Sequence, residues 1–151
     1  MDKKWTAAKS LFFSRALTVA TLVLAVAALF CIPVIAEWYD AVSGYADKIR
    51  TVLTVCLYLS DICGIFALWQ LFKVLGNFAK QRVFVKENAA CFRLISWCCF
   101  AVSVIWLALM YWRFLAFFVA FIAAFAGLIL RVMKNMLDAA VELREENDYT
   151  I

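Results

Sequence analysis

Four long stretches with almost no charged residues constrain the fold of this chain more than any other feature. A helix needs about 20 apolar residues to cross a hydrocarbon core of about 30 Å. The stretches are residues 16–36, 51–72 (interrupted only by Asp61), 94–112 and 114–130. The composition agrees, because 68% of the residues are hydrophobic, whereas soluble domains are roughly half apolar. We therefore predict an all-α integral membrane bundle of four transmembrane helices.

We expect a single membrane domain over residues 1–151, with spans at about 14–36, 50–74, 90–112 and 113–137. The first apolar run is longer than the apolar core of a cleaved signal peptide and lacks a clear cleavage site. We therefore interpret it as a retained helix. Asp47 is the expected N-cap of the second helix.

The Lys and Arg residues are distributed unevenly between the two sides of the predicted membrane. The N-terminal segment, the second connection and the C-terminal tail carry four, five and three of them, whereas the first and third connections carry two and one. Basic residues accumulate on the cytoplasmic side of membrane proteins, so we predict that both termini are cytoplasmic. The positive-inside rule already accounts for these basic residues. We therefore expect their positive charge to contact the headgroups of the lipid bilayer and not nucleic acid.

The last span is predicted to continue as a cytoplasmic helical tail over about residues 131–147. This stretch contains no Gly or Pro, and Lys134 and Asp138 are spaced as a favourable i, i+4 pair. Its apolar residues recur at alternating steps of three and four, as on a packed helix face. They are Ile129, Val132, Met136, Ala139 and Leu143. We expect this stripe to pack on the second connection, with a docking helix for a partner as the alternative.

Small residues at a spacing of four mark one face of the last span. They are Ala116, Ala120 and Ala124. Small side chains let two helix backbones approach closely in lipid. We expect this face to contact another helix of the same bundle, and the alternative is the interface of a homo-oligomer.

One acidic residue, Asp61, lies about midway along the second apolar stretch. A charge at the bilayer centre costs about 2.5–3.5 kcal/mol on insertion scales, so Asp61 must be neutral, paired or in contact with water. Two interpretations remain open, a proton or cation site and a structural clasp between helices. The hydroxyl residues that are candidates for contact with it are Ser60, Ser96, Ser103, Thr18 and Thr21.

The residue patterns of common catalytic and metal sites are missing from the sequence. The six cysteines include no C-x-x-C pair and there is no histidine, so neither a thiol redox pair nor a zinc site is predicted. Buried Cys behaves as a small apolar residue, which is the role we expect here. No glycine-rich phosphate loop is present either. We therefore predict no catalytic residue, metal or cofactor, and favour a non-enzymatic protein.

Two segments on the predicted cytoplasmic side resemble those of a bacterial membrane-protein family. The second connection reads QRVFVKENAACFRLI, and the chain ends in LREENDYTI. The residues that carry the resemblance are Phe84, Glu87, Asn88, Arg93, Asp148, Tyr149, Thr150 and Ile151. With these motifs the chain resembles the DUF2975 family of four-helix proteins of unknown function. The resemblance implies a location in the bacterial cytoplasmic membrane and a helix-turn-helix regulator as partner.

The chain departs from the family pattern where its first motif begins. The family tends to have Gly-x-Pro-Phe-Ser, and the corresponding residues here are Gln81, Arg82, Val83, Phe84 and Val85. Val85 has no side-chain oxygen with which to cap the third helix, so we expect the helix start to shift or to be held by Asn88. Tyr149 stands where the family usually has Leu.

We expect the second connection and the tail to form one cytoplasmic surface that a regulatory or membrane partner contacts. In this arrangement Arg93 meets the acidic tail, and the carboxylate of Ile151 meets Lys80 or Arg82. In the simpler alternative, each motif only caps its own helix. The alternative function is a small transporter or ion-conducting oligomer that uses Asp61.

Overall fold

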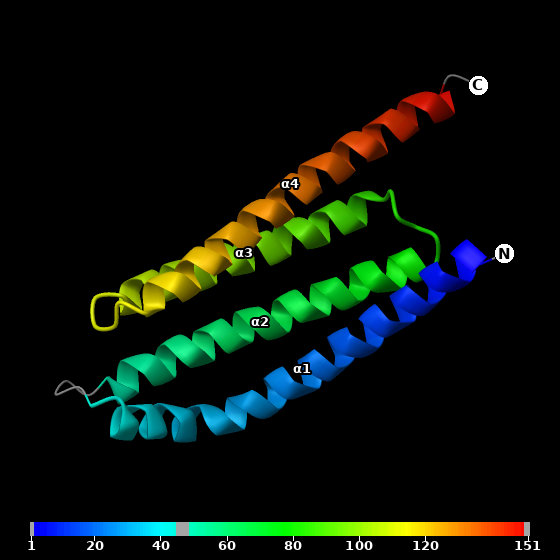
Figure 1. Cartoon of the computed structure of the whole chain (residues 1–151). Coiled ribbons are helices and arrows are strands. Elements are labelled where there is room, and N and C mark those ends of the chain that lie inside the picture. Colours follow the sequence, from blue (N-terminus) through cyan, green and yellow to red (C-terminus); the bar gives the residue numbers. More distant parts are fainter. Residues whose placement is uncertain (1, 45–48, 150–151) are drawn as a thin grey trace.

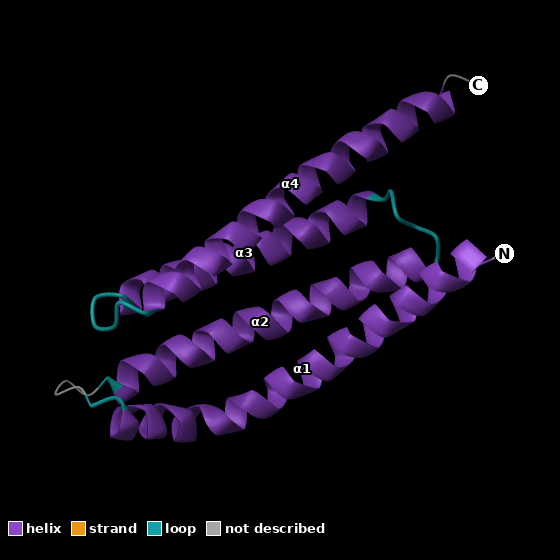
Figure 2. Cartoon of the chain, in the orientation of Figure 1, coloured by secondary structure: helices purple, strands orange, loops and turns teal. Residues whose placement is uncertain are grey.

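The chain folds into four long helices, and the computed structural model describes residues 2–44 and 49–149. The helices are α1 (Asp2–Val42), α2 (Arg50–Ala79), α3 (Lys86–Leu109) and α4 (Ala116–Tyr149). Figure 2 shows helices and short loops, with no strand in the described part of the chain. Each helix is long and apolar enough to cross a membrane. The prediction of an all-α membrane bundle with four spans is confirmed.

The four helices lie in an open row in the order of the sequence (Figure 1). Contacts join α1 to α2, α2 to α3 and α3 to α4, and no other pair of helices is in contact within the described ranges. The helices therefore do not close around a common core. Both α1 and α4 keep a whole side free of the other helices.

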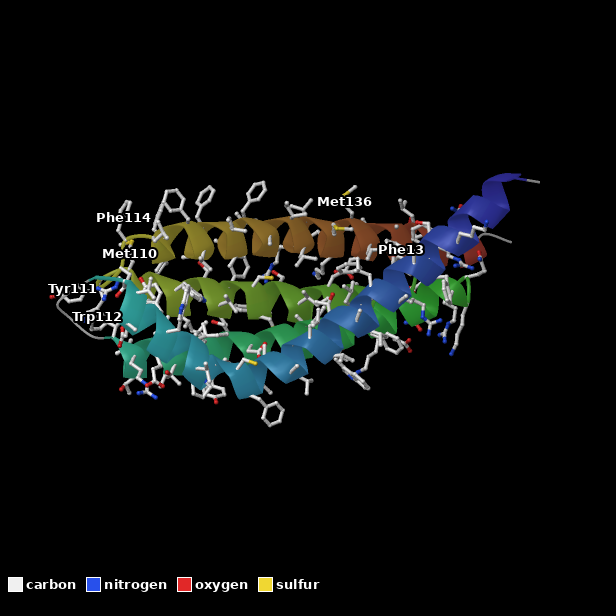
Figure 3. The ribbon with its side chains drawn as sticks, turned by 60° about the horizontal axis from the view of Figure 1, so that its bottom comes forward. Phe13, Met110, Tyr111, Trp112, Phe114 and Met136 are labelled. Carbon is white, nitrogen blue, oxygen red and sulfur yellow. The ribbon has the colours of Figure 1, made fainter. Side chains whose placement is uncertain are left out.

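Most large apolar side chains of the row point outward. Phe30 in α1 and Phe114 before α4 are 82% and 72% exposed. Figure 3 shows Phe114 and Met136 projecting from the row on the side away from α3. A soluble monomer rarely exposes so much contiguous apolar surface to water, whereas transmembrane helices expose such a surface to the hydrocarbon of the bilayer.

The α1–α2 and α3–α4 connections lie at the same end of the row, opposite the α2–α3 loop (Figure 1). At the first, the carboxylate of Asp40 accepts hydrogen bonds from the backbone N–H groups of Ile49 (3.2 Å) and Arg50 (2.8 Å) at the start of α2. Asp40 thus acts as a cap from ten residues upstream, and the predicted cap, Asp47, lies outside the described residues.

The connection between α3 and α4 is short and occupies residues 110–115. We expected these residues within the third and fourth spans, but α3 ends at Leu109 and α4 begins at Ala116. The turn is closed by backbone hydrogen bonds from Trp112 and Arg113 to the Leu109 carbonyl, at 3.0 and 3.1 Å. Arg113 is buried, and its Nη1 atom donates to the Trp112 carbonyl at 3.0 Å.

Small residues bring α3 and α4 together. Ala116 and Ala120 are buried. A Cβ atom added to Gly127 would lie 3.2 Å from Cys99 Cβ and 3.2 Å from Phe100 Cε1. The small-residue face therefore packs within the chain, which is the expected contact with a helix of the same bundle.

The apolar stripe of the tail does not pack on the second connection, so that expectation is wrong. Val132, Met136 and Leu143 are all exposed, whereas Val141 is buried. Each helical residue turns by about 100°, so residues 127, 134, 138, 141 and 145 share one side, and the stripe is centred about 160° away. The close contact at Gly127 determines which side of α4 faces α3.

Candidate functional site

The candidate site lies at the basic end of the row, where the α2–α3 loop and both termini lie (Figure 1). The loop leaves α2 through a Schellman turn. The N–H of Arg82 donates to the Asn77 carbonyl at 2.9 Å, and the N–H of Gln81 to the Phe78 carbonyl at 3.0 Å. This turn needs a left-handed residue, and Gln81 supplies it with φ 60°.

Asn88 holds the loop against both helices. It is fully buried, and its Nδ2 atom donates to the carbonyls of Arg82 (2.9 Å) and Val83 (2.8 Å). Its Oδ1 atom accepts a hydrogen bond from Asn77 Nδ2 in α2 at 2.8 Å. α3 starts at Lys86 after an extended Val85 that makes no side-chain cap. The start is thus stabilised by Asn88, two residues inside the helix.

The tail of α4 contacts the start of α3 through an ion pair. Lys86 Nζ lies 2.8 Å from Glu145 Oε1 and 3.0 Å from Oε2. A cavity of about 440 Å³ beside this pair includes Arg93, Asp138 and Glu142 in its lining. Arg93 therefore lines the same cavity as acidic residues of the tail.

A second cavity, of about 510 Å³, lies on the other side of the ion pair. Its lining includes Phe84 and Glu87 from the loop side and Arg144 from the tail. Phe84 is 47% exposed. The loop motif and the tail thus line shared cavities.

The remaining tail motif reaches the edge of the described chain. Asp148 and Tyr149 form the last turn of α4. Thr150 and Ile151 lie outside the described residues, as does the expected contact of the Ile151 carboxylate with Lys80 or Arg82.

Four of the five hydroxyl residues that were candidates for contact with Asp61 form hydrogen bonds with other groups. Ser60 accepts a hydrogen bond from Trp106 Nε1 of α3 at 2.9 Å, and Ser96 donates to the Gly127 carbonyl of α4 at 2.9 Å. The hydroxyls of Thr18 and Thr21 donate to carbonyls one turn earlier in α1. Ser103 is buried in α3.

Asp61 itself keeps an unsatisfied oxygen. Its Oδ2 atom is buried, and no described group donates a hydrogen bond to it. A buried acceptor without a donor is costly unless the group is protonated or hydrated. All six cysteines are free thiols, and among the described side chains, those of residues 9–44 and 49–147, no three His, Cys, Asp or Glu form a metal-binding group.

Two contacts of the tail were not anticipated from the sequence. The Lys86–Glu145 pair joins residues 59 positions apart, and the Arg131 guanidinium lies 5.5 Å from the centre of the Trp97 ring. A cation over an aromatic face is attracted to it. The only sequence signal was the presence of Lys and Arg near the helix ends, which does not specify partners.

Comparison with known proteins agrees with these features. The chain is 22% identical to an uncharacterized membrane protein, YoaS, of Bacillus subtilis (strain 168), over 94% of this chain and 97% of that protein. No solved structure matches the chain. Together with the four apolar helices, the likeness to YoaS identifies a multi-pass membrane protein. Residues 34–151 match the family of proteins of unknown function DUF2975, and the chain therefore belongs to that family.

Proposed function

We propose that the protein is a non-enzymatic membrane protein whose α2–α3 loop and α4 tail present one cytoplasmic surface to a regulatory or membrane partner. The observation that carries the proposal is the Lys86–Glu145 ion pair, 2.8 Å long, between the loop end of α3 and the tail. An exposed ion pair adds little stability, but it sets the position of the tail beside the loop. The loop motif and the described part of the tail then lie on one surface.

The orientation of this surface is inferred from charge. The N-terminus, the α2–α3 loop and the end of α4 lie at the same end of the row (Figure 1), and most of the Lys and Arg residues belong to these segments. The positive-inside rule assigns that end to the cytoplasm, in a bacterial cytoplasmic membrane. Reporter fusions at both termini test this orientation, and opposite locations of the two reporters would contradict it.

The tail offers apolar side chains beyond the expected membrane boundary. With 34 residues, α4 is about 51 Å long at 1.5 Å per residue, about 20 Å longer than a hydrocarbon core. Met136 and Leu143 are exposed on its outer side. An apolar stripe on a helix is a common docking face for a partner. A helix-turn-helix regulator, implied by the family resemblance, is the proposed partner, and a second copy of the chain is the alternative.

Charge reversal of the ion pair tests the proposal. A photocrosslinking amino acid replaces Phe84 in cells of the native host, and adducts are compared for Lys86→Glu, Glu145→Lys and the double variant. We expect each single variant to lose the adduct and the double variant to regain it. The matched control reverses Glu37 and Arg50, an exposed pair 3.2 Å apart at the opposite end of the row, and should keep the adduct.

The outcomes separate the partners. An adduct with a DNA-binding protein supports a regulator, and an adduct of two copies supports self-association. Identical adducts in all variants, or no adduct with any protein, would refute the proposed surface.

The second candidate function is a small transporter or ion-conducting oligomer, and the unsatisfied Oδ2 atom of Asp61 favours it. An ionisable group inside a membrane often marks an ion or proton path. Proton and cation flux into vesicles is measured for the wild type, Asp61→Asn and the control Asp138→Asn. Flux lost only in Asp61→Asn supports this function, and equal flux in vesicles without protein excludes it.

A further inference from the structure

We propose that a cavity between α1, α2 and α3 at the basic end binds the headgroup of an anionic phospholipid. The cavity has a volume of about 670 Å³. Arg15 of α1, Lys73 and Lys80 of α2 and Glu87 of α3 lie in its lining. Three cations face one carboxylate, so the cavity attracts an anion.

The depth of the cavity matches the headgroup layer. Arg15 directly precedes the charge-free stretch of α1, and Lys73 directly follows the apolar stretch of α2. Charged residues at such boundaries lie at the level of the lipid headgroups. Trp69 also lines the cavity and is half exposed, and Trp prefers this interface.

The cationic groups are available for a ligand. Within the described chain, Lys73 and Lys80 form no ion pair. The Arg15 guanidinium lies 5.3 Å from the centre of the Phe72 ring, a contact that orients the group while leaving its N–H donors for phosphate. Arg and Lys are the usual protein groups that bind phosphate.

The open row explains why the cavity can admit a lipid. Because α1 and α3 do not contact each other in the described structure, the groove over α2 is not closed by a fourth helix. Acyl chains of a bound lipid can therefore lie along the apolar parts of the row while the phosphate meets the cations. Basic pockets between transmembrane helices on the cytoplasmic side bind anionic headgroups in this way.

A neighbouring cavity provides the matched control. The 440 Å³ cavity between α3 and α4 is lined by three cations, among them Arg93, and by three carboxylates, so its charge is balanced. Removing a cation there leaves the proposed lipid site unchanged.

The test is native mass spectrometry of the full chain in detergent with added phosphatidylglycerol or phosphatidylcholine. We expect one phosphatidylglycerol to bind more tightly than phosphatidylcholine, with a loss of about fivefold for each cation removed. Arg15→Gln and Lys73→Gln should each show this loss, whereas Lys73→Arg and the control Arg93→Gln should retain the wild-type affinity. Lys80→Gln, at an exposed helix end, removes the third cation and should show the same loss. Far-UV circular dichroism verifies that the variants are folded.

Three results would overturn the proposal. They are equal affinity for the two lipids, equal loss in Arg93→Gln and Lys73→Gln, and displacement of phosphatidylglycerol by inorganic phosphate at the same concentration. The last result would assign the cavity to a free anion instead of a lipid.

Discussion

Asn77 and Asn88 join α2 to α3 directly, because Nδ2 of Asn77 donates a hydrogen bond to Oδ1 of Asn88 at 2.8 Å. The same Asn88 side chain also binds two loop carbonyls. One amide thus holds the end of one helix, the loop and the start of the next helix.

Asn88→Ala should lower the free energy of unfolding by about 2 kcal/mol, because it leaves several polar groups without their partner. Unfolding by sodium dodecyl sulfate in mixed micelles, followed by circular dichroism, measures the change. Asn135→Ala is the control, since Asn135 is exposed and accepts only a long hydrogen bond of 3.4 Å from Lys134. Equal losses in both variants would contradict the role of Asn88.

Gln81→Gly should stabilise the protein by about 0.5–1 kcal/mol. Gln81 has φ 60°, a conformation that is strained for a residue with a Cβ atom and unstrained for Gly. Gly44, with φ 67°, is the converse case, and Gly44→Ala should destabilise by a similar amount. The same unfolding assay checks both variants, and shifts of the same sign would refute the explanation.

Gly127→Val should lower the free energy of unfolding by about 1–3 kcal/mol. The added Cβ atom would lie 3.2 Å from atoms of Cys99 and Phe100, so the valine side chain forces α3 and α4 apart. Gly64→Val is the matched control in α2, where an added Cβ meets nothing within 4 Å. Thermal unfolding in detergent compares the two. A loss at Gly64 as large as that at Gly127 would show that the close helix contact is not the cause.

The hydrogen bond from Trp106 to Ser60, 2.9 Å long, should contribute about 0.6 kcal/mol, the average for such bonds within membranes. A double-mutant cycle with Ser60→Ala and Trp106→Phe isolates this term from the loss of packing. Additive effects of the two substitutions would mean that the bond does not stabilise the α2–α3 contact.

The membrane helices were predictable because a span must be long, apolar and internally hydrogen-bonded, and each of these properties is local in sequence. The partners of the charged side chains could not be predicted in this way. Glu145 meets Lys86 from 59 positions away, and Asp40 caps α2 across the first connection. Such pairs depend on how the chain turns between helices.

The tail shows a different limit of sequence analysis. Its apolar stripe suggested a packed face, yet the side that carries Lys134, Asp138 and Val141 faces the cavity against α3, and Met136 is exposed. Periodicity shows that two faces differ but does not show which of them meets a neighbouring helix. In a membrane protein, lipid competes with helices for apolar side chains, so the polar side can form the contact.

Because each described helix touches only the helix before or after it in the chain, the protein can assemble in the order of its synthesis. Each newly synthesised helix can pack against the helix that precedes it, and no helix needs a partner that is synthesised two or more helices later. Such local connectivity favours rapid folding. A nascent chain released after Ala79 would already contain the complete set of contacts between α1 and α2.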